Sequence, residues 1–353
     1  MNVGCSLFSG CGGDCVGMKA AGVDVKYYVE LMERFCETHD ANFDPGSCER
    51  LGNDIKKIPD EKFEALRGSL KVVVAGFPCQ SFSNGGKKDA NDPRGQLFRE
   101  FVRAARLSRP EYIIGENVKG LLTRKTSDGE LFIDVIIDEF RKIGYECKYR
   151  VLRADDFGVP QKRERLIIIG KRGDVDKELN FPEPKKKKND VKKIVKFDMT
   201  GACRVPDDMF EKLGVPEECV LKSARRGEQS GSASHPYLER LVRQEDVEWK
   251  GKKFEYPFSF GKRDSPIHAE IVDVRKPCKT IICTYARQPR LFVPLRNNRN
   301  ESYLRCLLPD ELKQIQGFPE DYKLCGSVTE QIVQIGNAVP PPLIAGVCET
   351  ILA

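Results

Sequence analysis

The chain has 353 residues, of which 40% are hydrophobic, and it carries a formal net charge of +6 with a sequence pI near 8.5. This length allows a large hydrophobic core and one or two domains. The charge permits a polyanionic partner without requiring one. The fourteen cysteines form no CxxC pair and the three histidines lie far apart in the sequence, so we expect no metal site.

The chain begins MNVGCSLFSG, with no charged segment followed by a long apolar stretch, and we find no apolar run that predicts a membrane span. We therefore expect a monomer with reduced thiols and no membrane association. The expected setting is intracellular: the cytoplasm for a bacterial protein, and the host cytoplasm or nucleus for a viral one.

The first half of the chain alternates apolar runs with helical patterns. The runs Val25–Val29, Val72–Ala75, Tyr112–Ile114 and Leu166–Ile169 predict strands. Between them, apolar residues recur at helical spacing around 97–105 and 131–140. This order predicts an α/β fold, with a doubly wound parallel sheet and crossover helices.

Small and polar residues follow these strands. FSGCGG (Phe8–Gly13) comes after the opening run, Glu30 ends the next strand, and GFPCQSFS (Gly76–Ser83) and ENV (Glu116–Val118) follow later ones. In open α/β sheets, ligands bind at the carboxyl ends of the strands. The sequence therefore predicts a ligand site at this edge.

The pattern changes after about residue 182. The segment FPEPKKKKNDVKK combines prolines with the lysine run Lys185–Lys188, which we interpret as a solvated linker. Residues from about 190 to 300 show many turn signals and predict a smaller, irregular or β-rich inserted domain. Helical patterns return at Leu307–Ile315 and Leu343–Leu352.

Cys79 is the candidate nucleophile, because it directly follows Pro78 in a polar strand-end loop rather than lying in an apolar run. The run QKRER (Gln161–Arg165) could supply charges that favour its thiolate. Glu116 could serve as an acid if burial favours its protonated form. Taken alone, the glycine-rich loop is as consistent with a simple turn as with a ligand loop, and an isolated ENV fits a structural carboxylate.

Five motifs taken together resemble the ordered motif set of the DNA cytosine C5-methyltransferases: FSGCGG, GFPCQSFS, ENVKGL, QKRERLIIIG and QIGNAVPPPL. The resemblance extends from Val3 to about Leu343, apart from a variable stretch between roughly 185 and 270. It implies a Rossmann-like methyltransferase sheet that binds S-adenosylmethionine, formed by residues 1–184 and 303–353. Residues 185–302 would form the inserted target-recognition domain and hinge.

The resemblance also implies a mechanism. Cys79 would add to C6 of a cytosine flipped out of double-stranded DNA, and Glu116 would contact N3. Arg163 and Arg165 would bracket the base and the nucleophile. The expected contacts of S-adenosylmethionine are Phe8, Gly10, Gly12, Glu30, Leu31, Asp54, Ile55, Pro78, Leu97, Asn337 and Ala338.

Contacts with DNA are expected from basic residues of the inserted domain and from the run KPCKTIICTY, which resembles the threonine-containing element that ends the family's recognition domain. The candidates are Arg225, Arg226, Lys250, Lys252, Lys253, Lys262, Arg263 and Thr280. The recognised DNA sequence, and the existence of a partner restriction enzyme, do not follow from one chain.

Two positions depart from the family pattern. Ser6 replaces the common acidic residue, and Leu31 replaces the usual aromatic residue beside Glu30. Neither touches the nucleophile. Methylation of transfer RNA is an alternative activity, although that branch typically has two prolines before the cysteine where this chain has Phe77–Pro78. A non-catalytic DNA-binding relative is disfavoured because Cys79 and Glu116 are both present.

Overall fold

The computed structural model describes residues 2–44, 46–78, 97–185, 188–223, 270–287 and 290–353, together with the backbone of four short strands between 242 and 259. Some residues singled out from the sequence lie outside the described residues: Cys79, Arg225, Arg226, Lys250, Lys262 and Arg263. Lys252 and Lys253 lie on one of the short strands, of which the backbone alone is described.

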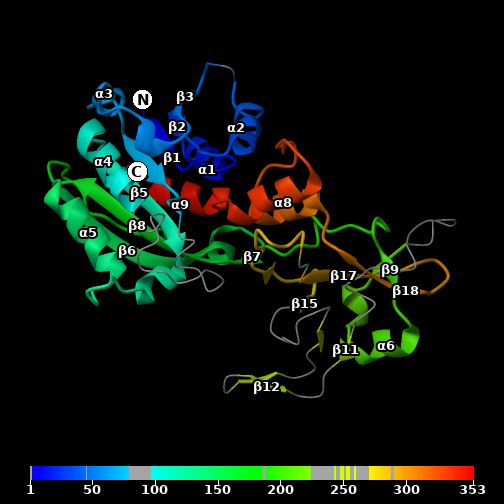
Figure 1. The fold of residues 1–353 in the computed structure, drawn as a ribbon. Helices are drawn as coiled ribbons and strands as arrows, with labels where there is room; N and C mark the ends of the chain where they lie inside the picture. Colours follow the sequence, from blue (N-terminus) through cyan, green and yellow to red (C-terminus); the bar gives the residue numbers. More distant parts are fainter. Residues whose placement is uncertain are drawn as a thin grey trace.

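A seven-stranded sheet with the order β3-β2-β1-β4-β5-β8-β6 forms the larger lobe (Figure 1). Its strands are β1 (Val3–Leu7), β2 (Asp24–Val29), β3 (Glu49–Gly52), β4 (Val72–Ala75), β5 (Tyr112–Val118), β6 (Tyr145–Arg153) and β8 (Glu164–Arg172). The five strands from β3 to β5 pair in parallel, as predicted.

The sequence predicted a parallel sheet, and the other end of the sheet departs from this prediction. There, β8 runs antiparallel to both β5 and β6. Between β6 and β8 the chain forms the 3-10 helix η4 (Ala154–Phe157) and the short strand β7 (Gln161–Lys162), but no crossover α-helix. Parallel neighbours need such a crossover, so β8 returns in the opposite direction.

Helices cover both faces of this sheet, which confirms the doubly wound fold. They are α1 (Gly13–Ala20), α2 (Glu33–Asp40), α3 (Asp60–Glu64), α4 (Phe98–Ser108), α5 (Phe132–Lys142) and α9 (Pro341–Leu352). Strand β4 is buried on both sides: Val73 and Ala75 join the core formed with α3, α4 and α5, while Val72 and Val74 join the core formed with α1 and α9. Figure 1 shows these two groups of helices on opposite sides of the sheet.

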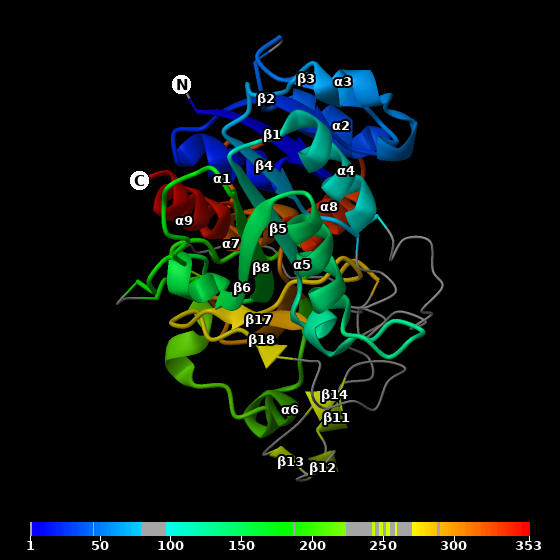
Figure 2. The same ribbon diagram turned by 90° about the vertical axis from the view of Figure 1, so that its left-hand side faces the viewer.

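The smaller lobe contains a second, five-stranded sheet (Figure 2). Its strands are β9 (Cys203–Arg204), β10 (Leu221–Lys222), β15 (Glu270–Ile271), β17 (Leu291–Arg296) and β18 (Ser302–Cys306), and the helix α6 (Asp207–Lys212) lies in the same lobe. Two further strand pairs are β11 (Val242–Arg243) with β14 (Phe258–Ser259), and β12 (Val247–Trp249) with β13 (Lys252–Phe254). The predicted domain boundaries stay a prediction; the one at 302/303 falls within β18, which pairs with β17.

The two lobes are joined through β16 (Cys278–Lys279), which pairs in parallel with β7, and through α7 (Pro309–Gln316) and α8 (Val328–Asn337). Helix α8 begins at a capping box, in which Ser327 accepts from the Glu330 backbone and Glu330 accepts from the Ser327 backbone.

By length and apolar composition alone, 328–352 could cross a membrane, which the sequence analysis did not predict. Helix α9 packs against α1 in the core, and 61% of an apolar stretch of 18 residues within this segment is buried.

Candidate active site at the carboxyl edge of the sheet

The predicted site residues that the structure describes gather where parallel strands end. Phe8 follows β1, Glu30 follows β2, Asp54 lies just after β3, Pro78 follows β4, and Glu116 lies near the end of β5. Because β1 to β5 are parallel neighbours, their carboxyl ends share one edge of the sheet. The expectation of a shared edge is confirmed for these residues.

The loop after β1 has an unusual backbone. Phe8, Gly10 and Gly12 all have positive φ, at 58°, 58° and 84°. A Cβ at Gly12 would lie 2.8 Å from Oη of Tyr322, and a Cβ at Gly13 would lie 2.3 Å from the carbonyl oxygen of Val339. A Cβ at Gly10 would meet no described atom within 4 Å. The loop is therefore packed at its helix end and open at Gly10, where a ligand could approach the backbone.

Glu30 fixes the open part of this loop. Its Oε2 accepts a hydrogen bond from the Gly10 backbone N–H, and its Oε1 accepts one from the Met32 backbone N–H, both at 2.8 Å. Burial raises the pKa of Glu30, while these backbone hydrogen bonds act in the opposite direction. Each carboxylate oxygen can accept a second hydrogen bond, so Glu30 can still bind ligand hydroxyls.

An apolar surface lies beside Glu30. Leu31 and Met32 are 63% and 54% exposed, which makes them two of the exposed large hydrophobic side chains of the described chain. Asp54 caps the 3-10 helix η1 (Ile55–Lys57), where its Oδ1 accepts from the Lys56 backbone N–H at 3.1 Å. Ile55 is buried in the core below. This combination of apolar surface and carboxylates suits a ligand with an aromatic ring and hydroxyl groups.

The segment around Asn337 returns to the first loop across more than 300 residues of sequence. The carbonyl of Val339 covers Gly13, and the thiol of Cys11 lies 3.7 Å from the carbonyl oxygen of Gln334. Asn337 itself is exposed and Ala338 is buried. The predicted proximity of these two motifs is therefore confirmed.

The strand end that precedes Cys79 lies next to Glu116. A Cβ at Gly76 would lie 3.8 Å from Oε2 of Glu116, 3.8 Å from the carbonyl oxygen of Phe8 and 3.4 Å from Cγ2 of Val339. Asn117, a residue that the sequence analysis did not single out, donates from Nδ2 to the Phe77 carbonyl at 3.2 Å. These contacts hold the backbone of Gly76 and Phe77 against the end of β5.

Glu116 forms a shielded ion pair with Arg165. The distance from Nε of Arg165 to Oε1 of Glu116 is 2.7 Å, and both side chains are about one-eighth exposed. The other carboxylate oxygen, Oε2, faces the Gly76 position. Arg165 therefore orients the carboxyl group of Glu116 towards the segment that leads to Cys79.

Arg163 has a different environment from the one expected. It is buried, and its guanidinium donates to the carbonyls of Ile281 (2.9 Å), Gly336 (3.0 Å) and Ala338 (3.2 Å). Burial lowers the pKa of Arg163 well below its usual value. Its Nε has no hydrogen-bond partner among the described residues. A contact between Arg163 and a base stays a prediction; in this structure the guanidinium joins two backbone segments, at Ile281 and at 336–338, to its own.

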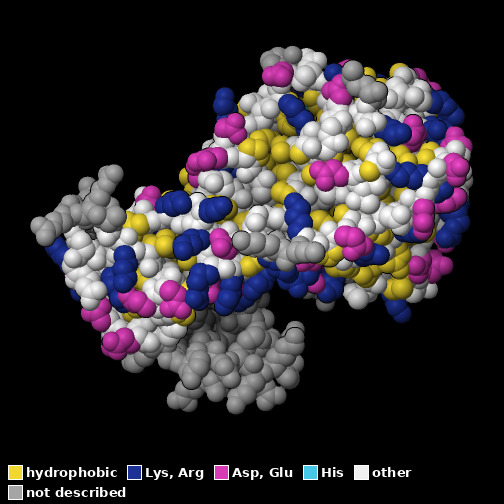
Figure 3. Space-filling view, turned by 180° about the vertical axis from the view of Figure 1, so that it is seen from behind, with side chains coloured by type: hydrophobic (Ala, Val, Ile, Leu, Met, Phe, Trp, Pro, Cys, Tyr) yellow, Lys and Arg dark blue, Asp and Glu magenta, His cyan; other side chains and the backbone are white. Residues whose placement is uncertain are grey.

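The described DNA-contact candidates lie in the smaller lobe and at its junction with the larger one. Thr280 donates from Oγ1 to the Lys162 carbonyl at 2.9 Å, next to the β7–β16 pair. The interpretation of Lys185–Lys188 as a solvated linker is wrong for Lys188. Its Nζ lies 2.6 Å from Oδ2 of buried Asp155 and 3.0 Å from Oδ1 of Asp156. Figure 3 shows Lys and Arg side chains gathered on the smaller lobe and along its junction with the larger lobe.

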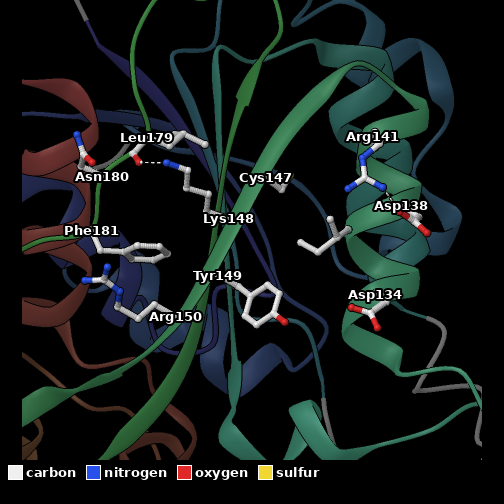
Figure 4. A pocket seen from close by; sticks show the side chains of 11 residues that line it. Asp134, Asp138, Arg141, Cys147, Lys148, Tyr149, Arg150, Leu179, Asn180 and Phe181 are labelled. Atoms are coloured by element: carbon white, nitrogen blue, oxygen red, sulfur yellow. Dashed lines mark hydrogen bonds and ion pairs between the residues drawn. The ribbon is translucent and has the colours of Figure 1, made fainter.

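A separate hollow lies at the far edge of the large sheet. It has a volume of about 700 Å³ and is lined by α5, β6 and residues 179–181 (Figure 4). Lys148 donates to the Leu179 carbonyl at 3.0 Å, and the Arg150 guanidinium stacks 4.8 Å above the ring of Phe181. None of the site residues predicted from the sequence lines this hollow.

Within the described ranges, no group of three or more His, Cys, Asp or Glu side chains is arranged to hold a metal ion.

The model of the C-5 cytosine-specific DNA methylase family matches residues 3–353. The chain belongs to this family. It is a DNA cytosine-5-methyltransferase, as the sequence motifs predicted.

Relatives of this methylase cover nearly its whole length. It is 31% identical to the Type II methyltransferase M1.HphI of Haemophilus parahaemolyticus, over 98% of this chain and 85% of the relative. It is 32% identical to the Type II methyltransferase M.PspPI of a Psychrobacter species, over 98% of this chain and 78% of the relative.

Two solved structures share the fold of the methylase. A Spodoptera frugiperda DNMT2 mutant aligns with a TM-score of 0.67 at 16% identity and covers 100% of both chains. The Entamoeba histolytica methyltransferase EhMeth aligns with a TM-score of 0.64 at 17% identity, over 100% of this chain and 98% of that one. These structures support the methyltransferase sheet.

Proposed function

We propose that this methylase transfers a methyl group from S-adenosylmethionine to C5 of a cytosine flipped out of double-stranded DNA, through a covalent bond between Cys79 and C6. The observation that carries the proposal is the position of Gly76, three residues before Cys79. A Cβ at Gly76 would lie 3.8 Å from Oε2 of Glu116 and 3.8 Å from the carbonyl oxygen of Phe8. The nucleophile segment, the acid and the donor loop therefore converge.

The residues at this edge fit the proposed donor. The open space at Gly10 allows close approach to the backbone, and Glu30 can accept hydrogen bonds from ribose hydroxyls. Leu31 offers aliphatic packing to the adenine, and Asp54 can accept from its amino group. The other proposed contacts are Phe8, Gly12, Ile55, Pro78, Leu97, Asn337 and Ala338. When bound, S-adenosylmethionine supplies an electrophilic methyl group.

The protein's own groups act on the pyrimidine. The Cys79 thiolate forms a bond to C6, and the electron pair of the C5–C6 double bond shifts to C5, from which it is delocalised through C4 to N3. The carboxyl proton of Glu116 forms a hydrogen bond to N3 and stabilises the negative charge that develops there, while Arg165 orients the carboxyl group. C5 then uses this electron pair to bond to the methyl group, as the methyl–sulfur bond of the donor would break and release S-adenosylhomocysteine. Loss of the C5 proton to a base and breakage of the S–C6 bond restore the aromatic ring and the thiolate.

The target carbon lies inside the duplex, so the base must leave the stack. Unstacking costs a few kcal/mol and must be offset by contacts to the base and to the surrounding backbone. The smaller lobe provides basic side chains for these contacts (Figure 3). Thr280, Lys252, Lys253, Arg225 and Arg226 are the proposed DNA contacts. The Type II relatives favour a modification enzyme that acts in the bacterial cytoplasm.

Methylation of transfer RNA is the second candidate function. The fold likeness to the DNMT2 structure extends over the whole chain, but at 16% identity it supports the fold alone. The segment Phe77–Pro78 favours the DNA reaction. Parallel assays with duplex DNA and transfer RNA will separate the two functions, and labelling of RNA alone would contradict our choice.

Trapping tests the covalent step. Duplex DNA containing 5-fluorocytosine cannot lose the C5 substituent, so wild-type protein with the donor should give an adduct that survives denaturing electrophoresis and maps to residue 79. Cys79→Ser should give no adduct. Cys325→Ser is the control, because that thiol lies near the Glu37 carbonyl on α2. An adduct that persists in Cys79→Ser, or an absent adduct in folded wild type, would contradict the mechanism.

A further inference from the structure

Five buried groups form a closed ring of hydrogen bonds that we call the bridging ring: Gln161, Arg163, Ile281, Gln316 and Ala338. The side chains of the ring bind both the backbone N–H and the backbone carbonyl of Ile281. Oε1 of Gln161 accepts from the Ile281 N–H at 2.8 Å, and Nη1 of Arg163 donates to the Ile281 carbonyl at 2.9 Å. Gln161 and Arg163 lie two residues apart in the sequence, so they hold Ile281 from one short segment.

The other side of the bridging ring holds Ala338. Nε2 of Gln161 donates to Oε1 of Gln316, and Nε2 of Gln316 donates to the Ala338 carbonyl, both at 2.6 Å. Nη2 of Arg163 donates to the same carbonyl at 3.2 Å. The carbonyl of Ala338 therefore accepts two hydrogen bonds from the ring, and Gln316 provides one of them.

The bridging ring is closed to solvent. Gln161 and Gln316 are fully buried, and Arg163 is 1% exposed. Water cannot replace a lost bond at such a site, so the relative positions of Ile281 and Ala338 depend on these side chains. Beside the ring, the backbone of Gly336 packs closely against the backbone of Cys283. A Cβ at Gly336 would lie only 2.3 Å from the backbone N of Cys283.

The ring joins three functional segments. Arg163 lies two residues before Arg165, which orients Glu116. Ile281 follows Thr280, the proposed DNA contact at the edge of the smaller lobe. Ala338 follows Asn337, the proposed donor contact. The bridging ring therefore lies between the donor site and the DNA site and contacts both through the backbone.

We infer that Gln316 is a positioning residue that couples donor binding to DNA binding through the bridging ring. This inference rests on the proposed function. A donor that holds Asn337, the last residue of α8, also holds Ala338, and through Gln316 and Gln161 it holds the Ile281 backbone. The segment that follows Thr280 is then ordered before DNA arrives, so DNA binding loses less conformational entropy.

Gln316→Met tests the coupling, because it keeps an unbranched side chain while removing both hydrogen bonds of the amide. Gln331→Met is the matched control: Gln331 lies on α8, and its Nε2 donates to the carbonyls of Leu324 and Gly326, outside the bridging ring. The measurement is the Kd of S-adenosylhomocysteine with and without a plasmid fragment that the wild type methylates.

DNA should tighten wild-type binding of S-adenosylhomocysteine by about tenfold, which is within the usual range of coupling between sites. Gln331→Met should keep this ratio, whereas Gln316→Met should reduce it to about one. A ratio that stays the same in Gln316→Met would overturn the inference, even if both affinities fall, because a merely structural role predicts that result.

Hydrogen exchange of the wild type provides a test that needs no variant. Added S-adenosylhomocysteine should slow exchange of the peptide that contains the Ile281 amide, since Gln161 holds that N–H. Unchanged exchange with the compound bound would overturn the coupling alone. A wild type that neither binds the compound nor methylates DNA would overturn the proposed function as well.

Discussion

Arg165 and Glu116 form an ion pair of 2.7 Å between Nε and Oε1, across the antiparallel strands β8 and β5. Neither residue is the nucleophile, yet the pair determines which carboxylate oxygen faces the strand end before Cys79. The orientation of the proposed acid therefore depends on a guanidinium from another strand.

Replacing Arg165 by lysine should lower kcat by about 100-fold, because a lysine keeps the charge but not the fixed geometry of the guanidinium. Single-turnover methyl transfer at saturating DNA measures this effect. Lys119→Met is the control, since Lys119 pairs with Glu164 at 3.1 Å at an exposed position nearby. That change should alter the rate less than about twofold. A wild-type rate in Arg165→Lys would show that the ion pair does not position the acid.

The two ends of the glycine-rich loop should respond differently to an added methyl group. Gly10→Ala should fold, at a cost of roughly 1–2 kcal/mol for its left-handed backbone, because no described atom lies within 4 Å of the new Cβ. It should weaken donor binding by about tenfold or more, equivalent to 1.4 kcal/mol. Gly13→Ala should instead destabilise the fold, because its Cβ would lie 2.3 Å from the Val339 carbonyl oxygen.

Thermal unfolding and calorimetric titration with S-adenosylhomocysteine separate these effects. Gly10→Ala that binds the compound as tightly as wild type would show that the open space is not part of the donor site.

Leu31 should affect donor affinity without affecting stability. Because it is 63% exposed, Leu31→Asp should change the free energy of unfolding by less than about 0.5 kcal/mol. Donor binding should weaken, since a charge replaces the aliphatic surface of the proposed adenine contact. Leu31→Phe should tighten binding by a few-fold, because ring stacking contributes about 0.5–1.5 kcal/mol. Val328→Asp is the exposed control, at 58% exposure on α8. Equal Kd values for all three variants would place the adenine elsewhere.

Asp14 should make stability depend on pH. Its carboxylate accepts from the Ser6 hydroxyl and from the Cys15 backbone N–H, and burial raises its pKa from 3.8 to about 7. This raised pKa belongs to the folded state. The contribution of the protonated Asp14 carboxyl group to the free energy of unfolding is therefore complete below pH 3.8 and is lost as pH rises to about 7. Asp14→Asn resembles the protonated form and should remove this loss, which amounts to a few kcal/mol at about 1.4 kcal/mol per pH unit.

Chemical denaturation of both proteins between pH 5 and pH 8 measures the effect. The variant should gain stability relative to wild type as pH rises through this range. A constant difference across the range would mean that the carboxyl group does not titrate there.

The sequence predicted the elements whose side chains are buried on a regular period. Strand β4 is apolar throughout because both of its faces are covered, and α4 and α5 show the apolar stripe of a helix packed on a sheet. Strand β6 was missed because most of its residues are exposed or half-buried at the edge of the sheet, so no apolar alternation identifies it. The reversal of β8 was missed because burial patterns carry no information about strand direction.

The same distinction applies to the site. Glu30 and Glu116 were found because one directly follows β2 and the other lies near the end of the apolar run of β5. The roles of Gln161, Gln316 and Asn117 depend on partners brought together by the fold, and the buried glutamines have no sequence signal that separates them from surface ones. Arg163 matched a motif, but the motif could not reveal that its guanidinium binds carbonyls more than 100 residues away.

The packing of α1 against α9 has a consequence for biosynthesis. Gly17 lies against the backbone of Pro341, more than 300 residues away in the sequence, and a Cβ at Gly17 would lie 2.5 Å from the Pro341 carbonyl oxygen. While a ribosome is still making the intervening chain, the side of α1 that faces α9 lacks its final cover and must be shielded by chaperones or transient contacts. The packing of α1 is thus completed late in translation, when α9 docks.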